Sequence, residues 1–339
     1  MKVLAADIGG TKTLLQVVDW PIGMGDRRVL ADRRYSSRDY SSFDDLLQVF
    51  LAEIDRTVAN SLASACFGVA GPIVKGIAKA TNLPWQLDSD HLQQQFNLPQ
   101  IALINDFQAQ GYGIECLKPD DFAVLQLGES EQKAPQALIG AGTGLGQALL
   151  VWREDLERYQ VLPTEGGHVD FAPMGEMQIE LLRYLSHSLE HVSYEHLLSG
   201  NGLVNIYHFL KENGKVTENP ALRMAINESD DPPAAISNFA LERVDPLANQ
   251  ALNLFAQIYG AQAGNLALTS LSRGGVFIGG GIAPKILKRL QGGDFMKAFL
   301  NKGRLSALLQ QIPVKVILEP KVGLWGAALV AMRLAHGKS

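Results

Sequence analysis

The sequence predicts an α/β protein made of two lobes, on three observations. The chain has 339 residues, which is longer than one compact core usually reaches. Short apolar runs typical of strands alternate with helical patterns. The stretches VLAADIGGTKTLLQVV (3–18) and QALIGAGTGLGQALLV (136–151) share a layout of strand, glycine turn and strand. This shared layout indicates a weak structural repeat.

The first part of the chain is expected to begin with a β-meander and to continue with alternating helices and strands. Apolar runs that end at turn residues predict strands at Val3–Ala6, Thr13–Val18, Arg28–Tyr35, Ala63–Val69 and Ile101–Ile104. A turn is expected at Pro21–Gly25. Helical spacing predicts a helix over Ser42–Asn60 with Ser42 as its N-cap, and polar caps predict another over Asp88–Phe96.

A second copy of this pattern begins near residue 120. Strands are expected at Phe122–Leu127, Ala137–Gly140, Ala148–Trp152, Gly275–Ile278 and Val314–Leu318. Helices are expected at Met177–Ser188, Leu203–Asn213, Pro246–Leu268 and Leu324–Ala335. The polar, proline-containing stretch Asn227–Pro233 is expected to form a surface loop.

Composition excludes several classes of protein. Hydrophobic residues make up 47% and charged residues 19% of the chain, as in folded proteins rather than disordered ones. The formal net charge is -5 without a basic block, which argues against nucleic acid as a partner. Cys66 and Cys116 are too few for a disulfide framework, so a reducing cytoplasm is expected. Neither a signal peptide nor an apolar membrane span is apparent, and no membrane partner is expected.

The first motif that carries chemistry is Asp7, Ile8, Gly9, Gly10, Thr11 and Lys12. Glycines in a turn between two strands let a phosphate approach the backbone N–H groups, and Thr11 adds a hydroxyl donor. Asp7 would hold Mg²⁺ directly or through water, because Mg²⁺ prefers carboxylates and keeps part of its hydration shell. The alternative is an ordinary hairpin with a buried Asp at the end of its strand.

A second phosphate cradle is predicted at Gly140, Ala141, Gly142, Thr143, Gly144, Leu145 and Gly146. No Gly-Lys-Ser/Thr follows, which excludes a Walker loop, and a strand follows in place of the helix that a dinucleotide fingerprint requires. Turn geometry alone is the alternative.

The triple glycine Gly279, Gly280 and Gly281 leaves room for a flat ring against the backbone, so an adenosine pocket is a further hypothesis. Its alternative is a plain turn before Pro284.

Asn105 and Asp106 follow a buried strand, at the sheet edge where ligands bind in α/β proteins. Asp106 would accept the proton of an attacking hydroxyl, and Asn105 would hydrogen-bond a neighbouring hydroxyl. Position alone favours Asp106 as the N-cap of a helix over Phe107–Gly111, and the two roles are compatible.

Candidate sugar ligands are Glu165 and His168 in the sequence Glu-Gly-Gly-His, together with Glu195. A carboxylate and an imidazole on a short turn would offer acceptors and donors to sugar hydroxyls. A metal site is the rival interpretation of the turn, although no second His or Cys lies at ligand spacing. For Glu195, spacing alone favours a solvated position on a helix face.

The order of these motifs resembles the superfamily of sugar kinases, actin and heat-shock ATPases, and within it the bacterial glucokinase family. The stretches that carry the resemblance are ADIGGT (6–11), FGVAGPI (67–73), TNLPW (81–85), INDFQAQGYGI (104–114), GAGTGLG (140–146), TEGGHVDFAP (164–173), YEHLLSGNGLVNIY (194–207), FIGGGIAPK (277–285) and GLWGAA (323–328). TEGGHVDFAP and YEHLLSGNGL are the specific ones. Lys12 stands where the glucokinase family often has Asn. The Cys-rich zinc motif of the related repressor/kinase family is absent, which favours the glucokinase family.

The resemblance implies the two-lobed actin-like ATPase (ribonuclease H-like) fold, in which each lobe is a mixed sheet flanked by helices. Residues 1–112 and 318–339 would form the small lobe, and residues 113–317 the large lobe. It implies a homodimeric, ATP- and Mg²⁺-dependent enzyme that phosphorylates the 6-hydroxyl of D-glucose in the first step of glycolysis. A kinase for another hexose or an amino sugar is the main alternative, and a sugar-responsive repressor or an ATP-driven chaperone are the others.

The resemblance also implies residue roles. Asp106 would be the catalytic base. The glucose ligands would be Asn105, Asp106, Glu165, His168 and Glu195. The nucleotide contacts would be Ala6, Asp7, Ile8, Gly9, Gly10, Thr11, Gly142 and Thr143, to which the triple-glycine hypothesis adds Gly280. Glucose would bind between the lobes, which would then close and exclude water.

Overall fold

The computed structural model describes residues 1–21, 27–214, 216–242 and 245–337. The expected turn at Pro21–Gly25 lies almost wholly outside them. The chain divides into two compact units, Met1–Pro119 with Glu319–Ser339, and Asp120–Leu318. This division places residues 113–119 in the first unit and Leu318 in the second. The lobe boundaries at 112 and 318 stay a prediction.

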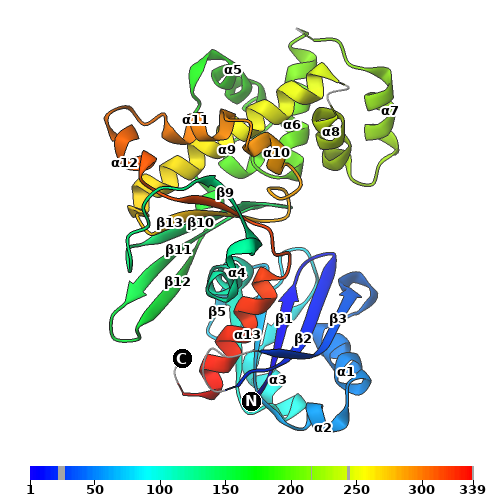
Figure 1. Cartoon of the computed structure of the whole chain (residues 1–339). Helices are drawn as coiled ribbons and strands as arrows, with labels where there is room; N and C mark the ends of the chain where they lie inside the picture. Colours follow the sequence, from blue (N-terminus) through cyan, green and yellow to red (C-terminus); the bar gives the residue numbers. More distant parts are fainter. Residues whose placement is uncertain (22–26, 215, 243–244, 338–339) are drawn as a thin grey trace. The chain divides into compact units, whose positions relative to one another are not determined.

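The first unit is built on a five-stranded sheet in the order β3-β2-β1-β4-β8 (Figure 1). Its strands are β1 (Lys2–Ile8), β2 (Lys12–Asp19), β3 (Arg28–Ser36), β4 (Leu62–Val69) and β8 (Ile101–Asn105). The three strands β1, β2 and β3 form the expected antiparallel meander. β4 runs parallel to β1, and β8 runs parallel to β4.

Helices cover both faces of this sheet. They are α1 (Phe43–Glu53), α2 (Arg56–Ala59), α3 (Ser89–Phe96), α4 (Asp106–Gly113) and α13 (Val322–Ala335). Side chains of β1 alternate between two cores: Leu4, Ala6 and Ile8 pack with residues of α1 and α3, whereas Val3 and Ala5 pack with residues of α4 and α13. Figure 1 shows the C-terminal helix α13, in red, beside the dark-blue strand β1. A sheet buried on both faces explains why its strands are almost continuously apolar.

The second unit repeats the strand order of the first. Its sheet runs β12-β11-β10-β13-β14-β9, so five strands have the same sequence order as in the first unit and β9 extends the edge. The strands are β9 (Phe122–Gln126), β10 (Gln136–Ala141), β11 (Leu145–Arg153), β12 (Arg158–Thr164), β13 (Gly275–Gly279) and β14 (Val314–Ile317). β10 pairs antiparallel with β11 and parallel with β13, as β1 does with β2 and β4. The internal repeat expected from the glycine turns is confirmed at the level of topology.

The core of the second unit is centred on α9 (Pro246–Ser270), which is buried along most of its length. The other helices are α5 (Gly175–Leu185), α6 (Gly200–Glu212), α7 (Pro220–Glu228), α8 (Pro232–Leu241), α10 (Leu287–Leu290), α11 (Asp294–Leu300) and α12 (Ser306–Gln310). Figure 1 shows α9, in yellow, running beside α6 and α8 and under α11. The mixed sheets flanked by helices confirm the expected fold class.

Short elements complete the two units. A three-stranded sheet of β5 (Ile73–Val74), β6 (Ile77–Lys79) and β7 (Gln86–Asp88) was not expected from the sequence. The 3₁₀ turns are η1 (Ser37–Asp39), η2 (Ile114–Cys116), η3 (Pro119–Asp121), η4 (Gly166–His168), η5 (Tyr194–His196) and η6 (Gly303–Leu305). No helix in the described part of the chain has both the length and the apolar character that a membrane span requires.

Two expectations about the extent of helices and loops were wrong. The helix expected over Ser42–Asn60 ends at Glu53, because Asp55 accepts hydrogen bonds from the N–H groups of Thr57 and Val58 and begins a new helix. The loop expected at Asn227–Pro233 is mostly the end of α7 and the start of α8. Proline stands in the first turn of each of these helices, after an Asn or Asp cap, where it favours helix initiation instead of a loop.

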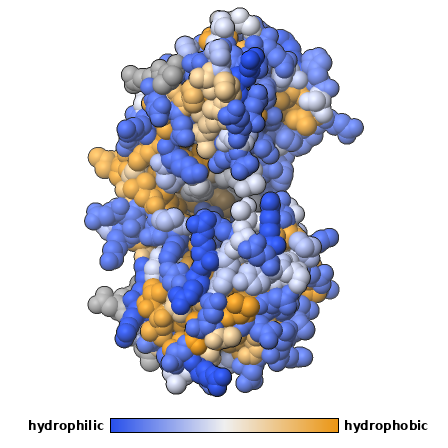
Figure 2. All heavy atoms as spheres, turned by 90° about the vertical axis from the view of Figure 1, so that its right-hand side faces the viewer, coloured by the Kyte–Doolittle hydropathy of each residue, from blue (hydrophilic) through white to orange (hydrophobic). Residues whose placement is uncertain are grey.

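Most large apolar side chains are buried in these cores, and the surface is mixed. Figure 2 shows one face of the molecule, on which hydrophilic residues predominate and hydrophobic residues form separate patches. Scattered apolar residues on a surface are normal and indicate no interface by themselves.

Candidate active site

The first glycine turn joins β1 to β2 and is tied to a neighbouring segment. The Gly9 N–H donates to the Lys12 carbonyl oxygen at 3.0 Å, which closes the turn. The Ser37 hydroxyl donates to the Gly9 carbonyl oxygen at 2.8 Å and lies 3.0 Å from the Thr13 hydroxyl. These bonds hold the turn rigid, while the side chain of Thr11 at its tip stays exposed.

Asp7 is the half-buried acid at the end of β1. Burial raises the pKa of its carboxyl group, and the positive charge of Lys12 partly offsets that rise. The Asp7 carboxyl group has no hydrogen-bond partner among the described residues. Its neighbours Ala6 and Ile8 are fully buried in the core, so only their backbone groups are available to a ligand.

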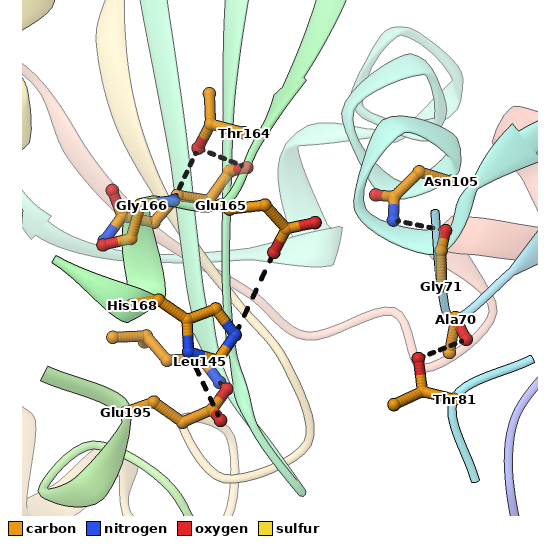
Figure 3. Close-up of polar contacts among 11 residues, drawn as sticks. Ala70, Gly71, Thr81, Asn105, Leu145, Thr164, Glu165, Gly166, His168 and Glu195 are labelled. Carbon is orange, nitrogen blue, oxygen red and sulfur yellow. Dashed lines mark hydrogen bonds and ion pairs between the residues drawn. The ribbon is translucent and has the colours of Figure 1, made fainter. Parts of the chain in front are cut away.

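Asn105 and Asp106 mark the junction of β8 and α4. The Asn105 carboxamide oxygen accepts from the N–H groups of Phe107 at 2.9 Å and Gln108 at 3.3 Å, and its Nδ2 donates to the Gly71 carbonyl oxygen at 3.5 Å (Figure 3). The N-cap of α4 is therefore Asn105, and the assignment of Asp106 as the cap was wrong. Asp106 is the first residue of the helix, where the N-terminal end of the helix favours a negative charge.

The second glycine turn, between β10 and β11, meets the triple glycine. The Gly142 N–H donates to the Gly144 carbonyl oxygen at 2.8 Å, and the Gly142 carbonyl oxygen accepts from the Gly200 N–H at 2.9 Å. A Cβ on Gly142 would lie 4.0 Å from the Gly281 nitrogen, and one on Gly281 would have no neighbour within 4 Å. Thr143, at the tip, is exposed. The two loops thus bring backbone without side chains close together at Gly142 and Gly281.

Gly280 needs to be glycine for a structural reason. Its φ is +77°, and a Cβ there would lie 2.4 Å from the Ala141 carbonyl oxygen. The alternative interpretation, a plain turn after the strand, accounts for this one glycine. It does not account for Gly281, which has neither a positive φ nor a close neighbour.

The Glu-Gly-Gly-His turn packs directly on β11. A Cβ on Gly167 would lie 2.0 Å from the Leu145 carbonyl oxygen, so only glycine allows this approach. The buried Gln147 side chain donates to the Gly166 carbonyl oxygen at 3.0 Å, and the Thr164 hydroxyl donates to the Gln147 carbonyl oxygen at 3.1 Å. The turn is therefore fixed, whereas the Glu165 and His168 side chains are exposed.

Glu195 is held beside this turn, contrary to the expectation of a solvated helix face. It lies in η5, and its Oε2 accepts from the Leu145 N–H at 2.8 Å. His168 lies between the two acids: its Nδ1 is 4.0 Å from Glu195 Oε1, and its Nε2 is 4.0 Å from Glu165 Oε2 (Figure 3). Distances of 4.0 Å are beyond hydrogen-bond range, which leaves donor and acceptor capacity for ligand hydroxyls.

The structure brings the expected residues together within each unit. Asp7, the first glycine turn, Asn105 and Asp106 belong to the first unit, and the second glycine turn, the triple glycine, Glu165, His168 and Glu195 belong to the second. Two supports were not expected from the sequence: the Leu145 N–H, which holds Glu195, and the Gln147 side chain, which holds the Glu-Gly-Gly-His turn. Gln147 is a polar residue among apolar ones in its strand, which was the available signal.

The metal-site interpretation of the Glu-Gly-Gly-His turn finds no support. No group of three or more His, Cys, Asp or Glu residues in the described ranges is arranged to hold a metal ion. Cys66 and Cys116 are both buried free thiols.

Solved structures resemble this chain over nearly its whole length. A glucokinase from an Antarctic psychrotroph superposes with a TM-score of 0.84 at 31% identity, covering 98% of this chain and 99% of its own. A ROK family glucokinase from Streptomyces griseus, solved in complex with glucose and AMPPNP, superposes with a TM-score of 0.66 at 21% identity, covering 98% and 100%. The fold and the site groups together define a sugar kinase with the actin-like ATPase fold.

Sequence comparison identifies the family within that class. The glucokinase from Nostoc punctiforme is 46% identical over 98% of this chain and 99% of its own length. The family model described as Glucokinase matches residues 4–334. The chain therefore belongs to the glucokinase family.

Proposed function

We propose that this chain transfers the γ-phosphoryl group of ATP to the 6-hydroxyl of D-glucose, giving glucose 6-phosphate and ADP in the first step of glycolysis. Membership of the glucokinase family supports the reaction. The observation that carries the sugar site is the arrangement of the half-buried Glu195 with the exposed His168 and Glu165, whose donors and acceptors stand on rigid turns. Sugar recognition requires such fixed hydrogen-bonding groups.

Asp106 is the general base of the proposed reaction. Its carboxylate takes the proton from the glucose 6-hydroxyl as that oxygen bonds to the γ-phosphorus and the bond from the γ-phosphorus to the bridging oxygen of ADP breaks. Asn105 both caps α4 and binds a neighbouring sugar hydroxyl through its amide group. Since α4 begins at Asp106, the helix fixes the base relative to the sheet.

The two glycine turns hold the nucleotide. The backbone of residues 6–11, with the Thr11 hydroxyl, and the Gly142–Thr143 segment contact its phosphates, and the Gly280 region lies against adenosine. A phosphoryl-transfer transition state is stabilised mainly by positioned donors, which backbone N–H groups supply without reorganisation. The bare backbone at Gly142 and Gly281 supports this assignment.

Asp7 is the residue that would hold Mg²⁺, directly or through water. A half-buried carboxylate without a hydrogen-bond partner among the described residues fits a cation, and a single acid suits Mg²⁺, which keeps waters and substrate phosphate as its other ligands. When bound, Mg²⁺ neutralises charge on the phosphates.

We also propose that the protein is a homodimer, which the family resemblance supports. We propose a cytoplasmic location, which the two unpaired thiols support.

The test is purified protein with ATP, Mg²⁺ and a panel of hexoses and amino sugars, followed by ADP release. Glucose is expected to give the highest kcat/KM. Asp106→Ala should lower kcat by about 10²–10⁴-fold while glucose still binds by calorimetry. Asp90→Ala, an exposed acid in the first turn of α3, is the matched control and should not change kcat. A near-normal rate for Asp106→Ala would exclude Asp106 as the base.

A further inference from the structure

Lys302 reaches from the end of α11 into a half-buried position against α9. Its ammonium group donates to the Ala261 carbonyl oxygen at 3.0 Å and to the Asn265 Oδ1 at 2.7 Å. Gly264 allows the close approach of this segment, since a Cβ there would lie 2.6 Å from the Phe299 carbonyl oxygen and 2.9 Å from the Lys302 Cε. Burial lowers the pKa of this lysine. The two acceptors offset the cost of burying its charge.

The Lys302 ammonium group sets the orientation of Asn265. An ammonium group is a donor only, so the oxygen of the Asn265 carboxamide must face it and the nitrogen must face the other way. Asn265 Nδ2 accordingly donates to the Tyr194 hydroxyl oxygen at 3.1 Å and to the Gln262 Oε1 at 3.1 Å. The Lys302 charge therefore determines that the Asn265 amide nitrogen, and not its oxygen, faces the Tyr194 hydroxyl.

Tyr194 anchors the turn that carries Glu195. Its ring is 2% exposed and packs edge-on against Phe171, with ring centroids 5.6 Å apart. Its N–H donates to the Val169 carbonyl oxygen at 3.1 Å, and its own carbonyl oxygen accepts from the Leu198 N–H at 2.8 Å. The residue thus joins η5 to the segment that follows His168.

We propose that Lys302, Asn265 and Tyr194 form a positioning chain for glucose recognition, which holds Glu195 and His168 at the separation that the sugar requires. This inference rests on the proposed role of those two residues in glucose binding. None of the three chain members needs to touch the sugar. Because Glu195 follows Tyr194 directly, a shift of the phenol ring changes the position of the Glu195 carboxylate relative to the Leu145 N–H.

The test compares Tyr194→Phe with Tyr207→Phe. Each change removes one phenol oxygen from a buried ring, and Tyr207 donates to Glu218 at 2.8 Å from α6, outside the chain. Tyr194→Phe is expected to raise the glucose KM about two- to tenfold, the range for one lost hydrogen bond, with the ATP KM unchanged. Tyr207→Phe is expected to lower the Tm similarly and to leave the glucose KM at the wild-type value.

Asn265→Ala should raise the glucose KM in the same direction. The double variant with Tyr194→Phe should show less than the product of the two effects, because both changes break the same contact. A loss of Tm alone, with the glucose KM unchanged in Tyr194→Phe, would show that the chain only stabilises the fold and would overturn the inference. If Asn265→Ala does not fold, Tyr194→Phe decides the matter alone.

Glu195→Gln separates this inference from the proposed sugar site. A raised glucose KM in Glu195→Gln together with a normal one in Tyr194→Phe would leave the site assignment intact and refute the positioning chain. A normal glucose KM in both variants would refute the assignment of Glu195 itself. A rise in both, with Tyr207→Phe unaffected, is the expected result.

Discussion

Asp7 shows how stability and function conflict at a single residue. Burial raises the pKa of its carboxyl group, so the ionised form is less favourable in the folded protein than in the unfolded chain. The folded state then binds more protons than the unfolded state between the two pKa values. The free energy of unfolding falls as the pH rises through the folded pKa. Ionised Asp7 therefore lowers the free energy of unfolding, and a bound cation would offset that effect.

We therefore expect Asp7→Asn to raise the Tm at neutral pH and to abolish most turnover. The gain in Tm should shrink as the pH falls, because the protonated Asp7 of the parent no longer carries the cost. Thermal unfolding of both proteins at about pH 7.5 and about pH 5, beside kcat, measures this. A Tm difference that grows in acid would contradict it.

Asp55→Ala is the control with the opposite sign. Hydrogen bonds from Thr57 and Val58 lower the pKa of Asp55, so its stabilisation is present above its ordinary pKa and is lost as the pH falls through the folded value. Asp55→Ala should lower the Tm at neutral pH, with a smaller effect in acid and no effect on kcat.

At the scale of elements, α13 supports the helix that carries Asp106. The two helices approach closely: a Cβ on Gly326 of α13 would lie 1.7 Å from the Ala109 carbonyl oxygen of α4. One turn earlier, a Cβ on Gly323 would meet Asp7 Oδ2 and Gln110 Cγ at 3.5 Å, which is ordinary contact. Gly326 therefore has no room for a Cβ, whereas Gly323 does.

Gly326→Ala should destabilise the protein by about 1–3 kcal/mol, the usual effect of overpacking, and should lower kcat because α4 is displaced. Gly323→Ala is the matched control. It should keep or raise the Tm, since Ala favours a helix over Gly by roughly 1 kcal/mol. Chemical denaturation and kcat of both variants measure this. Equal stability of the two would show that α13 and α4 can separate without cost.

At the scale of the whole molecule, the first unit is discontinuous in sequence. Residues 319–339 return to it after the second unit, and α13 supplies Leu324, Ala327, Ala328 and Ala331 to the core that also holds Val3 and Ala5. Without α13, one face of the five-stranded sheet would expose this apolar surface.

We expect a fragment of residues 1–119 to be unfolded or aggregated, and a fragment with residues 319–339 joined to it by a flexible linker to fold. The reason is the apolar face that α13 buries. Circular dichroism and cooperative thermal unfolding measure the difference. A cooperative transition in the shorter fragment would show that α13 is dispensable for the first unit.

Local signals predicted most elements, and the misses in helix boundaries come from local patterns that fit two structures. The strands of both sheets except β12 follow from apolar runs, since strand formation in a buried sheet needs apolar residues in sequence. β12 (Arg158–Thr164) is largely polar and was not expected. The break after Glu53 and the helices begun by Pro220 and Pro232 depend on caps whose side chains fold back on N–H groups two or three residues later. The loop was expected because Asp or Asn before a proline is typical both of a turn and of a helix cap. The break after Glu53 was missed because the helical spacing of apolar residues continues across Asp55.

The sequence by itself determined that two glycine turns, an acid at a strand end and an Asn-Asp pair would stand at the edges of two sheets, because these features arise from neighbouring residues. Asn105 and Asp106 both suited the cap of α4 by local pattern, and the structure shows that Asn105 takes it. Only the tertiary structure decided that Glu195 turns from solvent to the Leu145 N–H. Residues 145 and 195 are far apart in the chain, so their contact depends on how β11 and η5 pack. No local pattern encodes such packing.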